Sequence, residues 1–133
     1  MTAPVRLRLF RTKGFDLQAL SRATNGLEAV KVTRPSAFSN PFTVRQATEV
    51  FDCRTESAHR HAVDWFRQWL DAEDESFEPM CAYDGLKDQR DTLLRRLPEL
   101  RGKNLACFCA PHLACHVDEL LKRANRPICE EVA

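Results

Sequence analysis

Residues 104–125 read NLACFCAPHLACHVDELLKRAN and combine an apolar run, a loop with polar and sulfur-containing side chains, and an amphipathic segment. Residues 105–109 have no strongly polar member, which predicts a strand buried on both faces, as in a parallel sheet. Pro111 in the turn that follows cannot donate a backbone hydrogen bond to continued pairing. From Cys115 onward, apolar residues at helical spacing predict a helix. The loop therefore lies at the carboxyl end of the strand, where open α/β sheets usually bind ligands.

The length and charge of the chain narrow the classes of protein. We expect the 133 residues to form one domain, with its core in residues 4–126 and a short tail in 127–133. The 20 basic and 19 acidic residues give a net charge of +1, which does not indicate nucleic-acid binding by the surface as a whole. No stretch approaches the roughly 20 apolar residues that span a bilayer, and no signal segment is visible. We expect a soluble, cytoplasmic protein without a membrane partner.

The six cysteines are expected to be reduced thiols, because a cytoplasmic domain with an ample core does not need disulfides. Cys53, Cys81 and Cys129 stand alone in the sequence, and a solitary free cysteine usually acts as a small buried hydrophobic residue. The chemistry is therefore expected from the remaining three.

Periodicity predicts the other elements. Leu7 and Leu9 alternate with charged residues, as in a half-buried strand. Asp16 can cap a helix that ends at Asn25 and Gly26. Residues 57–71 carry a broad apolar stripe whose tryptophans and phenylalanine we assign to the core. Further elements are a strand at 27–33 and helices at 43–52 and 86–97. These elements predict a single α/β domain with a mixed or mostly parallel sheet of about four to five strands, covered by helices.

Residues 34–42, RPSAFSNPF, form a loop after the second predicted strand. Its two prolines hold the preceding residues in extended conformations, and its serines and asparagine can bond back to the chain. Arg34 at the end of the strand can bind a carboxylate or phosphate in a forked geometry. We expect Arg34 to bind an anion, and Ser36 and Asn40 to orient polar groups of a ligand.

Two hypotheses account for Cys107, Cys109, Cys115 and His116. In the first, all four bind zinc, which prefers thiolate and imidazole ligands. Their spacing departs from the usual pairs of cysteines on turns, so this hypothesis is not favoured. In the second, Cys107 packs in the core, while Cys109, Cys115 and His116 face a ligand near the start of a helix. A thiol beside an imidazole can then act as nucleophile and base.

The two segments together resemble a small family of bacteria and phages, domain of unknown function 4326. The resemblance rests on RPS at 34–36 and NPF at 40–42, on LRGKNLACFCAP at 100–111, and on the adjacent Cys115 and His116. It covers nearly the whole domain. It supports the two segments as functional sites but does not imply a particular reaction. The family pattern has glycine before each of the first two motifs, where this chain has Thr33 and Ser39. Unlike glycine, these residues have side chains that hinder the close approach of a ligand to the backbone.

Our leading hypothesis is a site for a nucleotide- or nucleoside-like small ligand, built where residues 34–42 and 109–116 meet at one edge of the sheet. Strand-end loops beside a helix N-terminus suit phosphate groups. Cys115, His116 and Cys109 are the candidate catalytic residues if the ligand is processed, and no cofactor is favoured. The alternative is a zinc-stabilised, non-catalytic module that binds protein or nucleic acid. A third hypothesis is an interaction domain whose two loops point apart.

Overall fold

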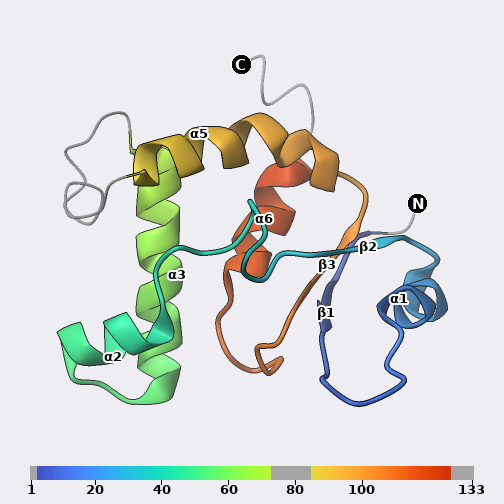
Figure 1. The fold of residues 1–133 in the computed structure, drawn as a ribbon, viewed down its shortest axis with the longest axis horizontal. Helices are drawn as coiled ribbons and strands as arrows, with labels where there is room; N and C mark the ends of the chain where they lie inside the picture. The colour runs from blue at the N-terminus through green and yellow to red at the C-terminus, as the bar shows by residue number, and fades with distance from the viewer. Residues whose placement is uncertain (1–2, 73–84, 127–133) are drawn as a thin grey trace.

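The central strand of the protein is buried on both faces and pairs with a strand on each side. The computed structural model describes residues 3–72 and 85–126, and its elements can be followed in Figure 1. Along the chain they are β1 (Arg6–Arg8), α1 (Leu17–Asn25), β2 (Ala29–Lys31), α2 (Val44–Phe51), α3 (Thr55–Asp71), α5 (Leu86–Arg96), the 3₁₀ helix η1 (Leu97–Leu100), β3 (Asn104–Cys107) and α6 (His116–Ala124).

All strands of the sheet are parallel, in the order β1-β3-β2. Ala106 of β3 lies opposite Leu7 on one side and Lys31 on the other. Every residue of β3 is buried, which confirms the prediction of a strand inside a parallel sheet. The strand ends at Cys107, however, so Cys109 belongs to the loop and not to the predicted strand 105–109.

The expected α/β class is confirmed, but the sheet has three strands in the described part of the chain, fewer than the predicted four to five. The two outer strands are also short, with three residues each. Residues 44–71 are almost entirely helical, and residues 34–42 form turns, so neither segment supplies another strand. The predicted strand at 27–33 is reduced to Ala29–Lys31, with one further backbone bond from Val32 to Ala106.

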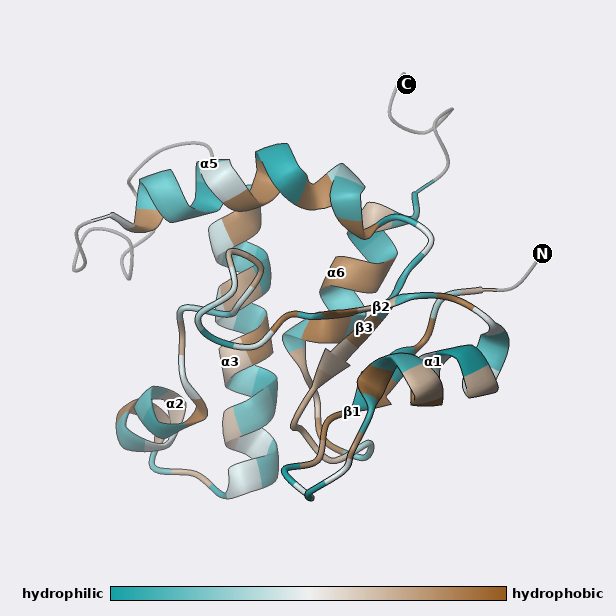
Figure 2. Cartoon of the chain, turned by 45° about the vertical axis from the view of Figure 1, so that its right-hand side comes forward, coloured by the Kyte–Doolittle hydropathy of each residue, from teal (hydrophilic) through white to brown (hydrophobic). Residues whose placement is uncertain are grey.

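Helices cover the sheet on both faces (Figure 2). On one face, α1 and the segment before it pack over a small apolar cluster that includes Leu7, Leu9 and Ala106. On the other face lies the main core, in which β3 and α6 meet α3, α5 and η1. Phe66 and Trp69 of α3 are fully buried there, which confirms their assignment to the core. The domain therefore has three layers: α1, the sheet, and a layer of helices on the other face.

The helix boundaries follow from local signals. The Asp16 side chain accepts a hydrogen bond from Ala19 N, and Gly26 ends α1 in a left-handed conformation, as predicted. Thr43 and Gln46 form a capping box at the start of α2. The helix predicted at 86–97 divides into α5 and η1 because Pro98 cannot continue the backbone bonding of an α-helix.

A buried asparagine joins the start of β3 to its surroundings. Asn104 is fully buried, and its amide forms a reciprocal pair with the Asn25 amide, at 2.9 and 2.7 Å. Its Oδ1 also accepts a bond from Val5 N, and its Nδ2 donates one to Ser21 Oγ. These bonds satisfy a polar group that would otherwise destabilise the fold by about 1–3 kcal/mol. They fix the position of β3 beside β1 and α1.

Several predictions concern residues outside the described ranges. Cys81, Cys129 and the tail at 127–133 are among them. Cys53 is described, and it is half-buried rather than fully buried. In the described ranges, no helix combines the length and the apolar character that a membrane span requires.

Candidate functional site

The two segments singled out from the sequence line one cavity at the carboxyl ends of β2 and β3. The cavity has a volume of about 280 Å³. Arg34 and Asn40 contribute from the first segment, which we call the RPS loop (residues 34–42). Cys109 and Cys115 contribute from the second, the cysteine loop (residues 109–116). The hypothesis that the loops point apart is therefore wrong.

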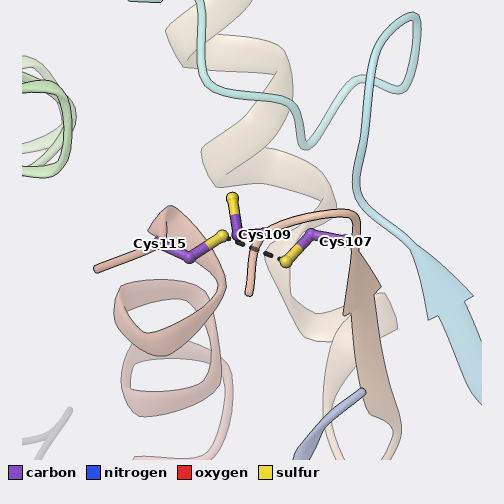
Figure 3. Close-up of side chains that lie close together, drawn as sticks. All are labelled: Cys107, Cys109 and Cys115. Atoms are coloured by element: carbon purple, nitrogen blue, oxygen red, sulfur yellow. Dashed lines mark hydrogen bonds between the residues drawn. The ribbon is translucent and has the colours of Figure 1, made fainter. Parts of the chain in front are cut away.

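Three cysteine sulfur atoms converge in this cavity (Figure 3). Cys107 is the last residue of β3, Cys109 follows in the loop, and Cys115 is the N-cap of α6. All three Sγ atoms lie within 4.8 Å of one another, and the Cys115 thiol donates to the Cys107 sulfur at 3.2 Å. Cys107 packs in the core as expected, but it also belongs to the thiol cluster, which the second hypothesis did not include. These three groups can hold a metal ion.

The thiols of the cluster change one another's acidity. Hydrogen bonds from Cys109 and Cys115 stabilise the thiolate of Cys107 and lower its pKa. The same interactions with Cys107 raise the pKa of Cys115 and of Cys109. Cys107 and Cys115 are only 2% and 3% exposed, whereas Cys109 is half-buried and is the most accessible of the three.

His116 is a buried, neutral imidazole. Its Nε2 lies 3.0 Å from Val32 O, and because a carbonyl only accepts, Nε2 carries the proton. Burial lowers the pKa of His116. Its Nδ1 is left as an acceptor 3.7 Å from Cys115 Sγ. The structure thus brings the predicted thiol and imidazole together, although both are buried and His116 does not join the set of converging sulfur atoms.

The predicted ligand-binding residues of the RPS loop differ in position. Arg34 is exposed at the cavity, and its Nη2 donates to the Asn40 carbonyl at 2.9 Å. The Asn40 side chain lines the cavity but is occupied, because it donates to Ala62 O and accepts from Phe42 N. Ser36 accepts from Phe38 N at 3.1 Å and is not among the residues that line this cavity. Arg34 is therefore the residue of this loop best placed to meet a ligand.

Arg6 was missed by the sequence analysis. Its Nη2 donates to the carbonyl oxygens of Ala110 and Leu113, at 2.6 and 2.9 Å, and its Nη1 pairs with Asp118 at 3.0 Å. Arg6 lies on β1 and holds the turn between Cys109 and Cys115. Its position on a strand beside β3 follows from the sheet order, which the sequence alone did not reveal.

His59 and Phe108 also line the cavity. His59 of α3 lies with its Nδ1 3.2 Å from Ala114 O. Phe108 is 38% exposed, lines the cavity, and lies under the Arg11 guanidinium at 4.2 Å from the ring centroid. The sequence did not predict that Phe108 lines the cavity, because this residue stands between two cysteines in an apolar run.

Comparison with known proteins gives one family. The family model described as domain of unknown function (DUF4326) matches residues 18–126, a range that includes the RPS loop and the cysteine loop. Neither the curated proteins nor the solved structures include a match to the chain.

Proposed function

Because the chain belongs to the family of domain of unknown function 4326, whose description assigns no activity, we propose its function from the site alone. The protein binds a small phosphate-bearing ligand, nucleotide- or nucleoside-like, in the cavity between the RPS loop and the cysteine loop. The observation that carries this proposal is that both loops line the same cavity of about 280 Å³ at the strand ends.

The phosphate end of the ligand is assigned to Arg34 and to the start of α6. The Arg34 guanidinium is exposed at the cavity and keeps donors beyond its single bond to Asn40 O. The N-terminus of α6 begins in the cavity wall at His116 and favours negative charge nearby. Both features attract the same kind of group.

The base end of the ligand is assigned to Phe108. Its ring is partly exposed and carries a guanidinium, that of Arg11, over its face. Nucleobases stack on aromatic rings and on guanidinium planes, independently of base identity. A cavity with a cation at one side and an exposed ring at another suits a nucleotide better than inorganic phosphate alone.

In protein without bound metal, chemical processing of the ligand is assigned to the cysteine loop. Cys109 is the sulfur that a ligand reaches most easily, and Cys115 and His116 lie behind it with 3.7 Å between sulfur and Nδ1. A thiol beside an imidazole acceptor is the arrangement that activates a nucleophile. An enzyme of this kind loses turnover when Cys109, Cys115 or His116 is replaced.

A second candidate function is a zinc-stabilised binding module without catalysis. The convergence of three sulfur atoms within 4.8 Å favours it, because thiolates are preferred zinc ligands. In that case zinc stabilises the folded protein, and the partner is a protein or a nucleic acid rather than a small molecule.

Calorimetric titration with a nucleoside monophosphate, the matching nucleoside and inorganic phosphate tests the proposal. The monophosphate binds most tightly, and Arg34→Ala weakens its binding by about tenfold to a hundredfold, the worth of a charged hydrogen bond. Arg22→Ala, an exposed arginine on α1 across the sheet, leaves binding unchanged and serves as the control. Equal binding by wild type and Arg34→Ala, or no binding of any of the three compounds, contradicts the proposal.

A further inference from the structure

The spacing of the three sulfur atoms suits a single metal ion. In a tetrahedral zinc site with Zn–S bonds of 2.3 Å, two sulfur atoms lie about 3.8 Å apart. The Cys107 and Cys115 sulfur atoms are at 3.2 Å, and all three lie within 4.8 Å of one another. Side-chain shifts of a few tenths of an ångström therefore bring the sulfur atoms to the distances that zinc requires.

The backbone that carries the sulfur atoms is fixed from three directions. The carbonyl of Cys107 accepts a bond from Leu9 N at 2.7 Å, which extends the sheet pairing beyond β1. Cys115 is held at the start of α6, and its carbonyl accepts from Asp118 N. Arg6 holds the turn between them through two carbonyl oxygens. A site built on such supports keeps its geometry before the ion arrives.

A fourth protein ligand does not converge on the sulfur atoms. Across residues 3–72 and 85–126, no histidine, aspartate or glutamate joins the set of three cysteines. The nearest candidate is His116, whose Nδ1 lies 3.7 Å from Cys115 Sγ but does not lie within 4.8 Å of all three sulfur atoms. Its ring is held by the bond from Nε2 to Val32 O and packs edge-on against Phe66 at 5.2 Å between centroids. All three cysteines line the cavity, so the remaining position is reached from there.

We propose that Cys107, Cys109 and Cys115 bind one zinc ion as thiolates, with the fourth coordination position open to the cavity. An oxygen, nitrogen or sulfur atom of the cavity ligand, or water, completes the tetrahedron. Three protein ligands with an open position are the pattern of catalytic zinc sites, whereas structural sites are closed by four. Each thiol loses its proton to solvent as the metal binds. The identity of the cavity ligand rests on the proposed function, but the metal site does not.

Metal analysis of the reduced, full-length protein tests the ligand set. Wild-type protein dialysed against zinc and then against metal-free buffer retains one zinc ion per chain. Cys107→Ser, Cys109→Ser and Cys115→Ser each lose it, while Cys53→Ser, a half-buried cysteine outside the cluster, retains it. Zinc retained by all of the variants, or no zinc in the wild type, overturns the proposal.

Cobalt substitution tests the open position and does not depend on variants that fold. In wild-type protein the intensity of the thiolate-to-cobalt charge-transfer bands indicates three thiolates, and the visible bands of tetrahedral cobalt shift when imidazole is added. A spectrum that imidazole does not change shows a closed site and overturns the open position. His116→Gln retains cobalt in the proposed site, whereas loss of the metal with an unchanged circular dichroism spectrum makes His116 the fourth ligand.

The metal proposal and the ligand proposal fail separately. If nucleotide still binds after chelation and no zinc is found, the metal site is disproved and the ligand site at Arg34 stands. If the protein binds zinc through three thiolates but binds no nucleotide, the proposed ligand class is disproved and the metal site stands.

Discussion

The Cys115 sulfur lies 3.2 Å from the Cys107 sulfur, although one residue ends a buried strand and the other begins a helix. The strand and the helix direct these side chains toward each other because α6 packs back on β3 across the main core. Both residues line the cavity, and Cys109 joins the thiol cluster from the loop.

Removal of a metal ion bound by the thiol cluster is expected to destabilise the protein. A ligand that binds only the folded state stabilises it by about 2.7 kcal/mol at a free concentration one hundred times its dissociation constant. Addition of a chelator to zinc-loaded wild-type protein therefore lowers the melting temperature by several degrees. Cys107→Ser shows no response to chelator, and a wild-type protein that also shows none contradicts the metal site.

Arg6→Ala is expected to loosen the turn between Cys109 and Cys115. The substitution removes two charged hydrogen bonds to carbonyl oxygens and an ion pair, from a side chain that is 13% exposed. We expect a loss of about 1.5–3 kcal/mol in unfolding free energy, measured by urea denaturation, and weaker zinc binding. Arg8→Ala is the matched control, since Arg8 is the exposed neighbour on β1 whose cation lies over Phe10. Equal effects of both substitutions would rule out a special role for Arg6.

Phe108→Ala is expected to weaken nucleoside binding more than it weakens phosphate binding. Stacking of a base on an aromatic ring is worth about 1–3 kcal/mol, so the dissociation constant of the nucleoside rises by about fivefold or more. Phe10→Ala provides the control, because Phe10 is also exposed, at 48%, and also lies under an arginine, but it does not line the cavity. Calorimetry that finds the same change for both variants would show that Phe108 does not contact the base.

Acidification is expected to destabilise the metal-free protein through His116. Burial lowers the pKa of this imidazole below its ordinary value of about 6.5, so the unfolded state binds the proton more readily. The contribution of His116 is complete above that ordinary pKa and is lost as the pH falls toward the folded-state pKa. Urea denaturation at pH 7.5 and at pH 5.5, with chelator present, should show a larger decrease for wild type than for His116→Gln. An equal decrease in the two proteins contradicts this assignment.

The sequence predicted the elements that depend on local patterns. The central strand, the cap at Asp16 and the apolar stripe of α3 were all identified, because burial and capping impose residue types at fixed spacing. The meeting of the two loops was also predicted, since the carboxyl ends of parallel strands share one edge of a sheet. The sequence did not indicate that the sheet stops at three strands, which depends on how much of the chain the helices use.

The details of the site were harder to predict because they depend on contacts between distant residues. Ser36 and Asn40 carry the polar groups expected of ligand contacts, and in the structure their side chains hydrogen-bond to backbone groups of Phe38, Phe42 and Ala62. Arg6 is separated from its carbonyl partners by about one hundred positions along the chain. Cys107 looked like a core residue, and only the packing of α6 shows that it also faces Cys115.

Nuclear magnetic resonance of the ¹⁵N-labelled protein, titrated with a nucleoside monophosphate, tests most directly whether the two loops share one ligand site. We expect the amide signals of the RPS loop and of the cysteine loop to shift together, with one dissociation constant, while those of α1 across the sheet do not move. Shifts confined to one loop, or no saturable shift in either, would contradict a shared ligand site between them.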